Sequence, residues 1–218
     1  MSIMALTLYY HPLASFCWKA LIPLYENDTP FEGQIVDLMD EPSAAAFKRI
    51  WPIRRFPVLH DGTRDRTVPE SSIIIEYLDQ HYPGRVRLVP HDPDLARETR
   101  FRDRFYDLYV HEPMQKIVTD RLRPPGKNDP HGVETARALL RTSLGMIDQD
   151  MAAKTWAMGE AFTMADCAAS PALFYADKVM PLGATWSNAA AYLERLKQRP
   201  AFTRVLNEAE PYFKNFPG

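Results

Sequence analysis

A chain of 218 residues that is 46% apolar and 25% charged has the composition of a globular protein with a buried core. Its formal net charge of −2 and its sequence pI near 6.3 give no general attraction for polyanions, so nucleic acid is not an expected partner. No apolar run approaches the roughly 20 residues of a membrane helix, and residues 1–10 lack the positively charged start of a secretion signal. We therefore expect a cytoplasmic protein with no membrane partner.

The cysteines and histidines do not predict a metal site. Cys17 and Cys167 lie far apart in the chain and form no C-x-x-C motif, and the six histidines show no ligand spacing such as H-E-x-x-H. Cys17 shares its helical phase with Leu21 and Leu24, so we expect it to be buried and inert. No metal and no disulfide are predicted.

The first third of the chain alternates between strand and helix patterns. Residues 6–10 are apolar and aromatic and end at a His-Pro loop, which predicts a buried strand. From Phe16 onward, apolar residues follow the spacing of an amphipathic helix that ends at Asn27-Asp28. At Pro23 we expect either a kink or a helix that tolerates the proline near its end. The other elements expected here are a strand over 31–37, a helix over 41–50, a hairpin with strands over 56–60 and around 67–68, and a helix over 71–81. This order matches a thioredoxin-like α/β domain.

Proline and glycine mark a boundary after the last of these helices. Pro83-Gly84 and Pro90 interrupt a polar stretch, and strand patterns nearly vanish beyond it. We place a first domain at 1–82, a linker at 83–92 and a second domain at 93–218. The second domain is predicted to be all-helical, with helices over 95–122 with a break near Glu112-Pro113, over 133–151, from 163 onward, over 192–196 and over 200–206.

The stretch from Arg55 to Tyr77 carries the chemistry of the first domain. It delivers Glu70 and Ser71 to the start of an apolar helix, where unpaired N–H groups and the helix dipole favour a carboxylate. Glu70 supplies the opposite charge, which suits an ammonium group. A free α-amino-acid end carries both groups on one carbon, so this pair predicts a γ-glutamyl or amino-acid site. The alternative is that the Glu and Ser side chains only cap the helix.

Phe56-Pro57 adds a second recognition element beside this helix start. A cis bond here would expose the Phe56 N–H and C=O to the side. An extended ligand could then pair with that backbone as an additional strand. The sequence therefore predicts a peptide-like ligand.

The pattern P-V-L-x-D-G followed by P-E-S-S-x-I-x-x-Y-L resembles the glutathione site of cytosolic glutathione S-transferases, whose bacterial zeta- and theta-like members share it. The resemblance implies that Phe56 and Pro57 hold the cysteinyl backbone of glutathione and that Glu70 and Ser71 hold its γ-glutamyl end. Arg55 is a candidate partner for a glutathione carboxylate, the alternative being an exposed charge. The resemblance extends over the helical half.

Within that helical half, Thr163 and Asp166 have the spacing of a capping box before an apolar helix. The family's helical domain resembles this arrangement, in which a buried T/S-x-x-D cap recurs as a folding element. We interpret Thr163 and Asp166 as structural and not catalytic.

Activation of the glutathione thiol is expected at the start of the first helix. A hydroxyl or N–H there can stabilise a thiolate, since the free thiol has a pKa of about 8.5. By resemblance to the family, the usual serine falls on Ala14, which has no hydroxyl, and the neighbouring hydroxyl is Ser15. We favour Ser15 as the catalytic residue. The alternatives are Tyr10, His11 or backbone amides as the donor, with Ser15 as a plain N-cap.

The resemblance also places an apolar electrophile pocket between the two domains. Its expected lining is His11 and Leu13 from the first loop, with Tyr106 and Tyr109 from the first helix of the second domain. The two tyrosines are three residues apart and would share one helix face. They could equally belong to the core.

Three functions remain open at this point. The first is a glutathione S-transferase that conjugates the glutathione thiolate to a small hydrophobic electrophile, with glutathione as co-substrate. The second is a glutathione-dependent isomerase or dehalogenase that uses the same site. The third is a non-catalytic binding or regulatory protein with this fold, which the missing serine at position 14 favours. The family resemblance also implies a homodimer, formed through the helix over 71–81 and the first helix of the second domain.

Overall fold

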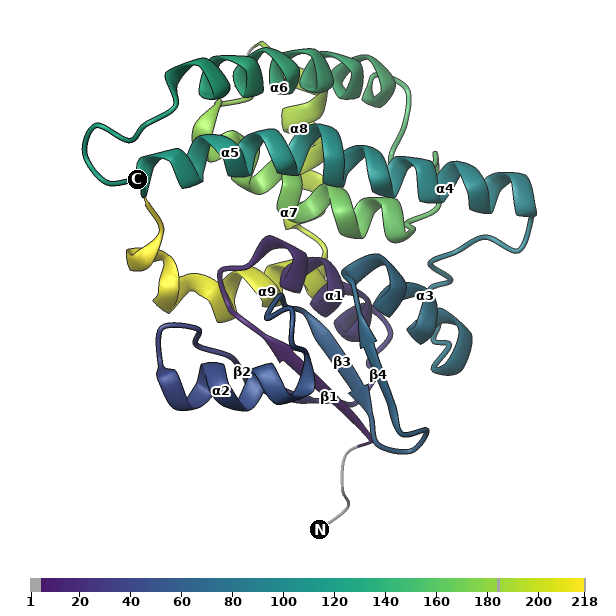
Figure 1. Ribbon diagram of the computed structural model, residues 1–218. Helices are drawn as coiled ribbons and strands as arrows, with labels where there is room; N and C mark the ends of the chain where they lie inside the picture. Colours follow the sequence, from purple (N-terminus) through teal and green to yellow (C-terminus); the bar gives the residue numbers. More distant parts are fainter. Residues whose placement is uncertain (1–4, 184, 218) are drawn as a thin grey trace.

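A computed structural model describes residues 5–183 and 185–217 and shows a mixed sheet with helices beside a larger group of helices (Figure 1). The first half contains a four-stranded sheet and three helices, and its element order confirms the predicted thioredoxin-like domain. Its elements are β1 (Leu6–Tyr10), α1 (Ser15–Glu26), β2 (Glu32–Ile35), α2 (Glu41–Ile50), β3 (Val58–Asp61), β4 (Arg66–Pro69) and α3 (Ser71–His81).

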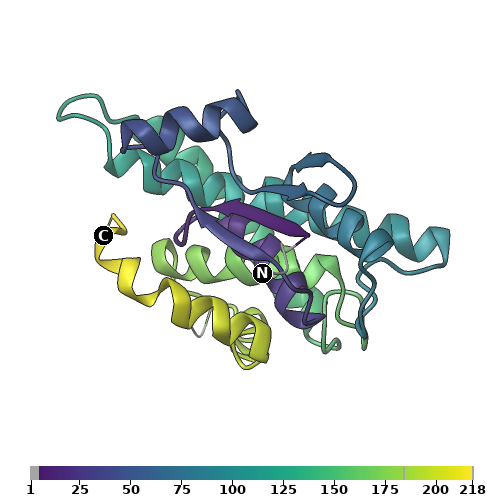
Figure 2. The same cartoon turned by 90° about the horizontal axis from the view of Figure 1, so that it is seen from below.

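The strand order in the sheet is β2-β1-β3-β4, with β1 and β2 parallel and the other pairs antiparallel. Successive side chains of a strand face opposite sides. Leu6 and Leu8 of β1 therefore pack into the main core with α1, whereas Tyr9 packs with Phe47 of α2 on the other face. Figure 2 shows α2 on one side of the sheet and α1 on the opposite side. Helix α1 also packs against α7 and α9, so it joins the sheet to the helical half.

The strand predicted over 31–37 is shorter than expected. The observed strand β2 covers four residues, all exposed, at the edge of the sheet. An edge strand packs against one neighbour only, so the alternation of Phe31, Gly33 and Ile35 does not mark a buried face. By contrast, Pro23 is accommodated near the end of α1, which continues to Glu26.

The second half is helical, as predicted. The linker predicted over 83–92 lies between α3 and α4, and the domain boundaries themselves stay a prediction. The helices are α4 (Pro93–Phe105), η1 (Tyr106–His111), α5 (Glu112–Arg121), α6 (Pro130–Met151), α7 (Met164–Val179), α8 (Ser187–Lys197), α9 (Pro200–Ala209) and η2 (Glu210–Asn215).

The break expected at Glu112-Pro113 has a different form from the one predicted. Glu112 stays in the helical region (φ −58°, ψ −49°), and η1 before it is a π-helix. The Glu112 N–H donates to the Asp107 carbonyl five residues earlier, the hydrogen-bond pattern of a π-turn. The extra residue in this turn places Pro113 in the first turn of α5, where its missing N–H costs no hydrogen bond.

The capping box at Thr163 and Asp166 is present and buried. Asp166 accepts hydrogen bonds from the Thr163 N–H (2.8 Å), the Ala157 N–H (2.8 Å) and the Tyr192 hydroxyl (2.6 Å). These bonds tie the start of α7 to the preceding loop and to α8, which supports a structural role. Helix α7 in turn packs against α1, so it fixes the helical half against the first domain. No helix in the described part of the chain is long and apolar enough to cross a membrane.

Candidate functional site

Two cavities open where the first domain meets the helical half, and they share Phe16, Arg55 and Phe56. We call the first the α3 cavity, because the start of α3 forms one wall; its volume is about 450 Å³. We call the second the α5 cavity, because η1 and α5 form one wall; its volume is about 700 Å³. A ligand that spans the shared residues would contact both cavities.

The start of α3 in the α3 cavity is not capped by its own side chains. Glu70 occupies the N-cap position without a side-chain cap hydrogen bond, and its φ of +69° lies in the left-handed region that is costly for a non-glycine residue. The first N–H groups of α3 are therefore available to a ligand. Ser71 is buried at the same helix start, and Glu70 is exposed. This geometry contradicts the alternative in which Glu70 is simply the cap.

Phe56, Pro57 and Arg55 line the α3 cavity on its other side. The Phe56-Pro57 peptide bond is cis. The strand β3 begins after this bond, at Val58, so Phe56 precedes the sheet ladder. The five residues predicted for glutathione binding are thus brought together around one cavity, and their binding roles stay a prediction.

A buried charge cluster lies behind the α3 cavity. Lys19 of α1 is fully buried, and its Nζ lies 2.7 Å from Asp103 Oδ1, 2.8 Å from Asp107 Oδ2 and 2.9 Å from Ser72 Oγ. The Ser72 hydroxyl donates to Asp103 Oδ2 at 2.7 Å. Burial raises the pKa of Asp107, against the lowering effect of Lys19. Arg104 also pairs with Asp107 at 3.0 Å, so two cations balance the two carboxylates of this cluster.

The α5 cavity begins at the start of α1. Ala14 is the N-cap of α1 and makes no side-chain cap hydrogen bond, so Ser15 is the first helical residue and not the N-cap. Ser15 is buried and lines the α5 cavity with Leu13 and Phe16. Its hydroxyl forms a short hydrogen bond with Nε2 of His111, from the end of η1. The plain N-cap alternative for Ser15 is therefore wrong.

His111 is the residue of this site that sequence reasoning missed. It is buried, its ring packs 4.2 Å from that of Phe16, and its Nδ1 has no hydrogen-bond partner among the described residues. Burial, with a smaller contribution from Lys19, lowers the pKa of His111 to about 4. The imidazole is therefore neutral near neutral pH. No spacing in the sequence links residues 15 and 111, because they meet only through the packing of the two halves.

The predicted electrophile-pocket residues separate in the structure. Leu13 lines the α5 cavity, and its carbonyl accepts a hydrogen bond from the Tyr175 hydroxyl at 2.7 Å. His11 lies beside this wall, where its ring stacks on Phe56 at 5.9 Å and its Nδ1 accepts from the Leu13 N–H. Burial lowers the pKa of His11, against the raising effect of Asp37.

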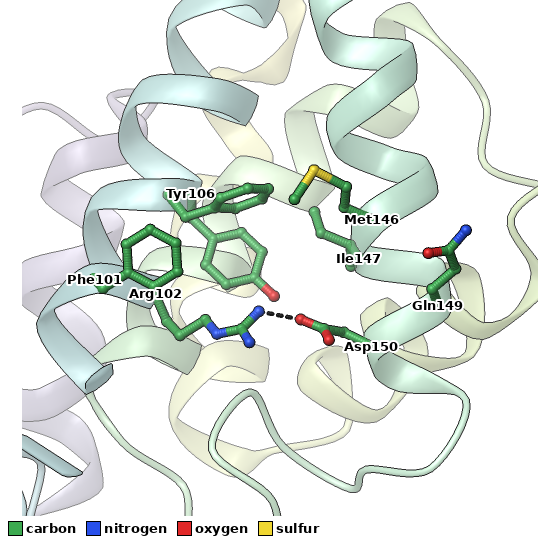
Figure 3. A pocket seen from close by; sticks show the side chains of 8 residues that line it. Phe101, Arg102, Tyr106, Met146, Ile147, Gln149 and Asp150 are labelled. Carbon is green, nitrogen blue, oxygen red and sulfur yellow. Dashed lines mark hydrogen bonds and ion pairs between the residues drawn. The ribbon is translucent and has the colours of Figure 1, made fainter. Parts of the chain in front are cut away.

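Tyr106 and Tyr109 do not line the α5 cavity, in contrast to the expectation. Tyr106 is buried and lines a separate cavity of about 210 Å³ between α4 and α6, where its hydroxyl points toward the Arg102–Asp150 ion pair (Figure 3). Tyr109 is 42% exposed. The sequence predicted that Tyr106 and Tyr109 share one face of an α-helix. Both residues belong instead to the π-helix η1, whose wider turn places residues three apart in different directions. Tyr106 is a core residue, the alternative that the sequence left open.

The cysteines agree with the prediction for them. Cys17 and Cys167 are both free and fully buried, and burial raises the pKa of each thiol. Cys17 Sγ accepts a hydrogen bond from the His11 N–H at 3.4 Å. Among residues 5–183 and 185–217, no group of three or more His, Cys, Asp or Glu residues could hold a metal ion.

Comparison with known proteins gives the family. Residues 8–86 match the glutathione S-transferase N-terminal domain, and residues 118–195 match the glutathione S-transferase C-terminal domain. The chain therefore belongs to the glutathione S-transferase family.

Individual relatives carry two kinds of name. A stringent starvation protein A homolog from Coxiella burnetii is 27% identical over 218 residues, covering 98% of this chain and 97% of that protein. Glutathione S-transferase GstB from Escherichia coli is 24% identical over 196 residues, covering 86% and 91%. The structure of a glutathione S-transferase from Methylobacillus flagellatus with bound glutathione matches with a TM-score of 0.84 at 23% identity, covering 92% of this chain and 98% of that one. This last match shows the fold.

Proposed function

We propose that this protein is a glutathione S-transferase that binds reduced glutathione and conjugates its thiolate to a small hydrophobic electrophile. The observation that carries the proposal is the junction of the two cavities. The uncapped start of α3 lies on one side of Phe16 and Phe56, and the Ser15–His111 pair lies on the other. One peptide-like ligand can therefore reach both an anion site and a hydroxyl donor.

Glutathione binding would use the α3 cavity. The α-carboxylate of the γ-glutamyl group would accept from the first N–H groups of α3 and from Ser71. Its ammonium would lie near the exposed carboxylate of Glu70. The cysteinyl backbone would pair with Phe56 beside Pro57, and Arg55 would hold a terminal carboxylate. Family members solved with glutathione bound support this ligand.

Thiolate stabilisation would come from Ser15 at the positive end of α1. A buried N–H without an acceptor is more costly than a bare ring nitrogen, so the unpartnered Nδ1 of His111 favours the tautomer with its proton on Nε2. His111 then donates to Ser15 Oγ, which leaves the Ser15 hydroxyl proton free to point at the sulfur. A chain of two hydrogen bonds polarises the donor more than one bond alone.

The catalytic gain would come from positioning and from thiolate stabilisation, with no covalent protein intermediate. The test is incubation with reduced glutathione and chlorodinitrobenzene, with the conjugate measured by absorbance and mass spectrometry. Enzyme-dependent formation of the thioether, with release of chloride, is the expected result. No conjugate at millimolar glutathione with several aryl and alkyl electrophiles would contradict the proposal.

A glutathione-dependent isomerase or dehalogenase would use the same two cavities. In such a reaction, glutathione adds to the substrate and then leaves again. The conjugation test separates the two cases, because an isomerase regenerates one glutathione per turnover and a transferase consumes one.

A non-catalytic binding protein is the second candidate function. Two observations favour it: Ala14 stands where the family's usual serine falls, and the relatives include proteins named stringent starvation protein A homologs. The open start of α3 and the Ser15–His111 pair favour the enzyme. Glutathione binding without conjugation of any electrophile would favour the second candidate.

We further propose a homodimer formed through α3 and α4. Ile73 of α3 and Phe101 of α4 are about half exposed, and Arg100 of α4 pairs with Glu76 of α3 through two hydrogen bonds of 2.8 Å. Sedimentation should give twice the chain mass of 25.0 kDa. The cytoplasm, where the glutathione pool is kept reducing, is the compartment in which we propose that it acts.

A further inference from the structure

Two neighbouring arginines lie at the mouth of the α5 cavity. Arg54 and Arg55 both line it, both are exposed, and neither has an ion-pair partner among the described residues. No acidic side chain in the described part of the chain lines this cavity, and His111 inside it is neutral near neutral pH. Among the described residues that line the α5 cavity, the two arginines are therefore the only side chains that carry a full charge near neutral pH.

The two arginines differ in what else they contact. Arg55 also lines the α3 cavity, where the proposed function assigns it to a glutathione carboxylate. Arg54 lines the α5 cavity and does not line the α3 cavity. The cation left over for a second ligand is thus Arg54.

The backbone at Arg54 is unusual for an arginine. Its φ is +58°, in the left-handed region, and its N–H donates to the Trp51 carbonyl at 2.9 Å to close a tight turn. Glycine adopts this conformation without steric cost, whereas any Cβ is penalised there. A residue held in a costly conformation beside a cavity points to a role for its side chain.

The rest of the α5 cavity suits an apolar body. Its volume of about 700 Å³ is that of a pocket for a small organic molecule. Apolar side chains from three separate regions line it, among them Leu13, Phe16, Met114, Val118, Leu122 and Phe216. Polar groups such as Gln115 and Thr119 are neutral.

We propose that the electrophile taken by this protein is an aromatic or aliphatic molecule that bears an anionic group, such as a carboxylate, and that Arg54 binds this group at the cavity mouth. The inference rests on the proposed function and names its substrate class. The apolar body lies between Phe16 and Val118, and the reacting carbon faces Ser15, where the thiolate forms. The guanidinium of Arg54 matches the planar geometry of a carboxylate.

The test uses chlorodinitrobenzoate and its methyl ester, which differ in charge at one position. In both, the glutathione sulfur forms a bond to the ring carbon that bears chlorine, chloride leaves with the bonding electron pair, and the thiol proton passes to solvent. The measured quantity is the ratio of kcat/KM for the acid to kcat/KM for the ester. Because the two compounds differ in intrinsic reactivity, this ratio is compared between wild type and variants.

The acid-to-ester ratio of kcat/KM is expected to fall about fivefold in Arg54→Gln, the effect of losing one exposed ion pair. In wild type, the same ratio should fall as the salt concentration is raised, because salt screens the charge of Arg54. Arg54→Lys keeps the charge and should keep most of the ratio. Arg49→Gln removes an exposed arginine of α2 that does not line the cavity, and should leave the ratio unchanged.

An unchanged ratio in Arg54→Gln, with both compounds conjugated, would overturn the inference and leave the proposed function intact. Conjugation of neither compound would overturn the proposed function and the inference with it.

Discussion

The α3 and α5 cavities share three residues and differ in the charges around them. Five carboxylates and three arginines line the α3 cavity, whereas Arg54 and Arg55 line the α5 cavity with no carboxylate among the described residues. A zwitterionic γ-glutamyl end requires protein charges of both signs. A hydrophobic electrophile with one anionic group requires only one positive charge, such as that of Arg54. If the proposed function holds, the two ligands would bind by different physical means: electrostatic complementarity in the α3 cavity, and apolar burial with an anionic anchor in the α5 cavity.

Loss of the hydroxyl at the junction should have the largest effect. Ser15→Ala is expected to reduce kcat/KM for chlorodinitrobenzene by about 100- to 1,000-fold, the cost of removing one donor to a developing anion. Glutathione affinity should change little, since in the proposed complex the sulfur is the only glutathione atom that the Ser15 hydroxyl contacts. Ser15→Thr, which keeps the hydroxyl, should retain more activity than Ser15→Ala. Equal losses in both variants would show that packing, and not hydrogen bonding, explains the effect.

The buried neutral His111 should make the folded state sensitive to acid. Because its folded pKa of about 4 lies below the unfolded value of 6.5, the unfolded state takes up a proton first as the pH falls. From about pH 7 to about pH 4, wild type should lose about 3 kcal/mol of unfolding free energy more than His111→Gln does. Urea titrations measure this difference. His131→Gln, at an exposed position, should follow wild type.

Neutralising Glu70, an exposed carboxylate of the α3 cavity, should weaken glutathione binding without affecting binding of the electrophile. Glu70→Gln is expected to raise the glutathione Kd by about 10- to 100-fold, the range for one hydrogen bond to a charged group. Calorimetry measures the Kd, and Glu32→Gln on the exposed edge strand is the control. If Glu70→Gln binds as tightly as wild type, the γ-glutamyl end does not lie at the start of α3.

The smallest effect is expected at Tyr109. Because it does not line the α5 cavity, Tyr109→Ala should change kcat/KM by less than about twofold, within the range usual for surface substitutions. Phe16→Ala, at a residue shared by both cavities, should lower it clearly. A large loss in Tyr109→Ala would mean that the electrophile extends along η1, as the sequence suggested.

Local sequence patterns were sufficient to predict most elements of the first domain. The short helix predicted over 41–50 and the apolar helix predicted over 71–81 agree with α2 and α3. The short extent and edge position of β2, and the π-helix, were not predicted, since a strand's neighbours and a π-turn depend on tertiary packing. Candidate site residues that follow each other in sequence, such as Phe56-Pro57 and Glu70-Ser71, could be proposed from the sequence, and the structure places them around one cavity. The contacts Ser15–His111 and Lys19–Asp103 were not found, because they join distant segments.

The most direct test of the account is the pKa of the glutathione thiol in the complex, read from thiolate absorbance during a pH titration of the wild-type protein. The account predicts saturable binding and a thiol pKa at least about one unit below the free value of about 8.5. In Ser15→Ala, glutathione should still bind, but its thiol pKa should return toward the free value. Wild type that binds glutathione without lowering this pKa, or that shows no binding at millimolar glutathione, would contradict the central claim.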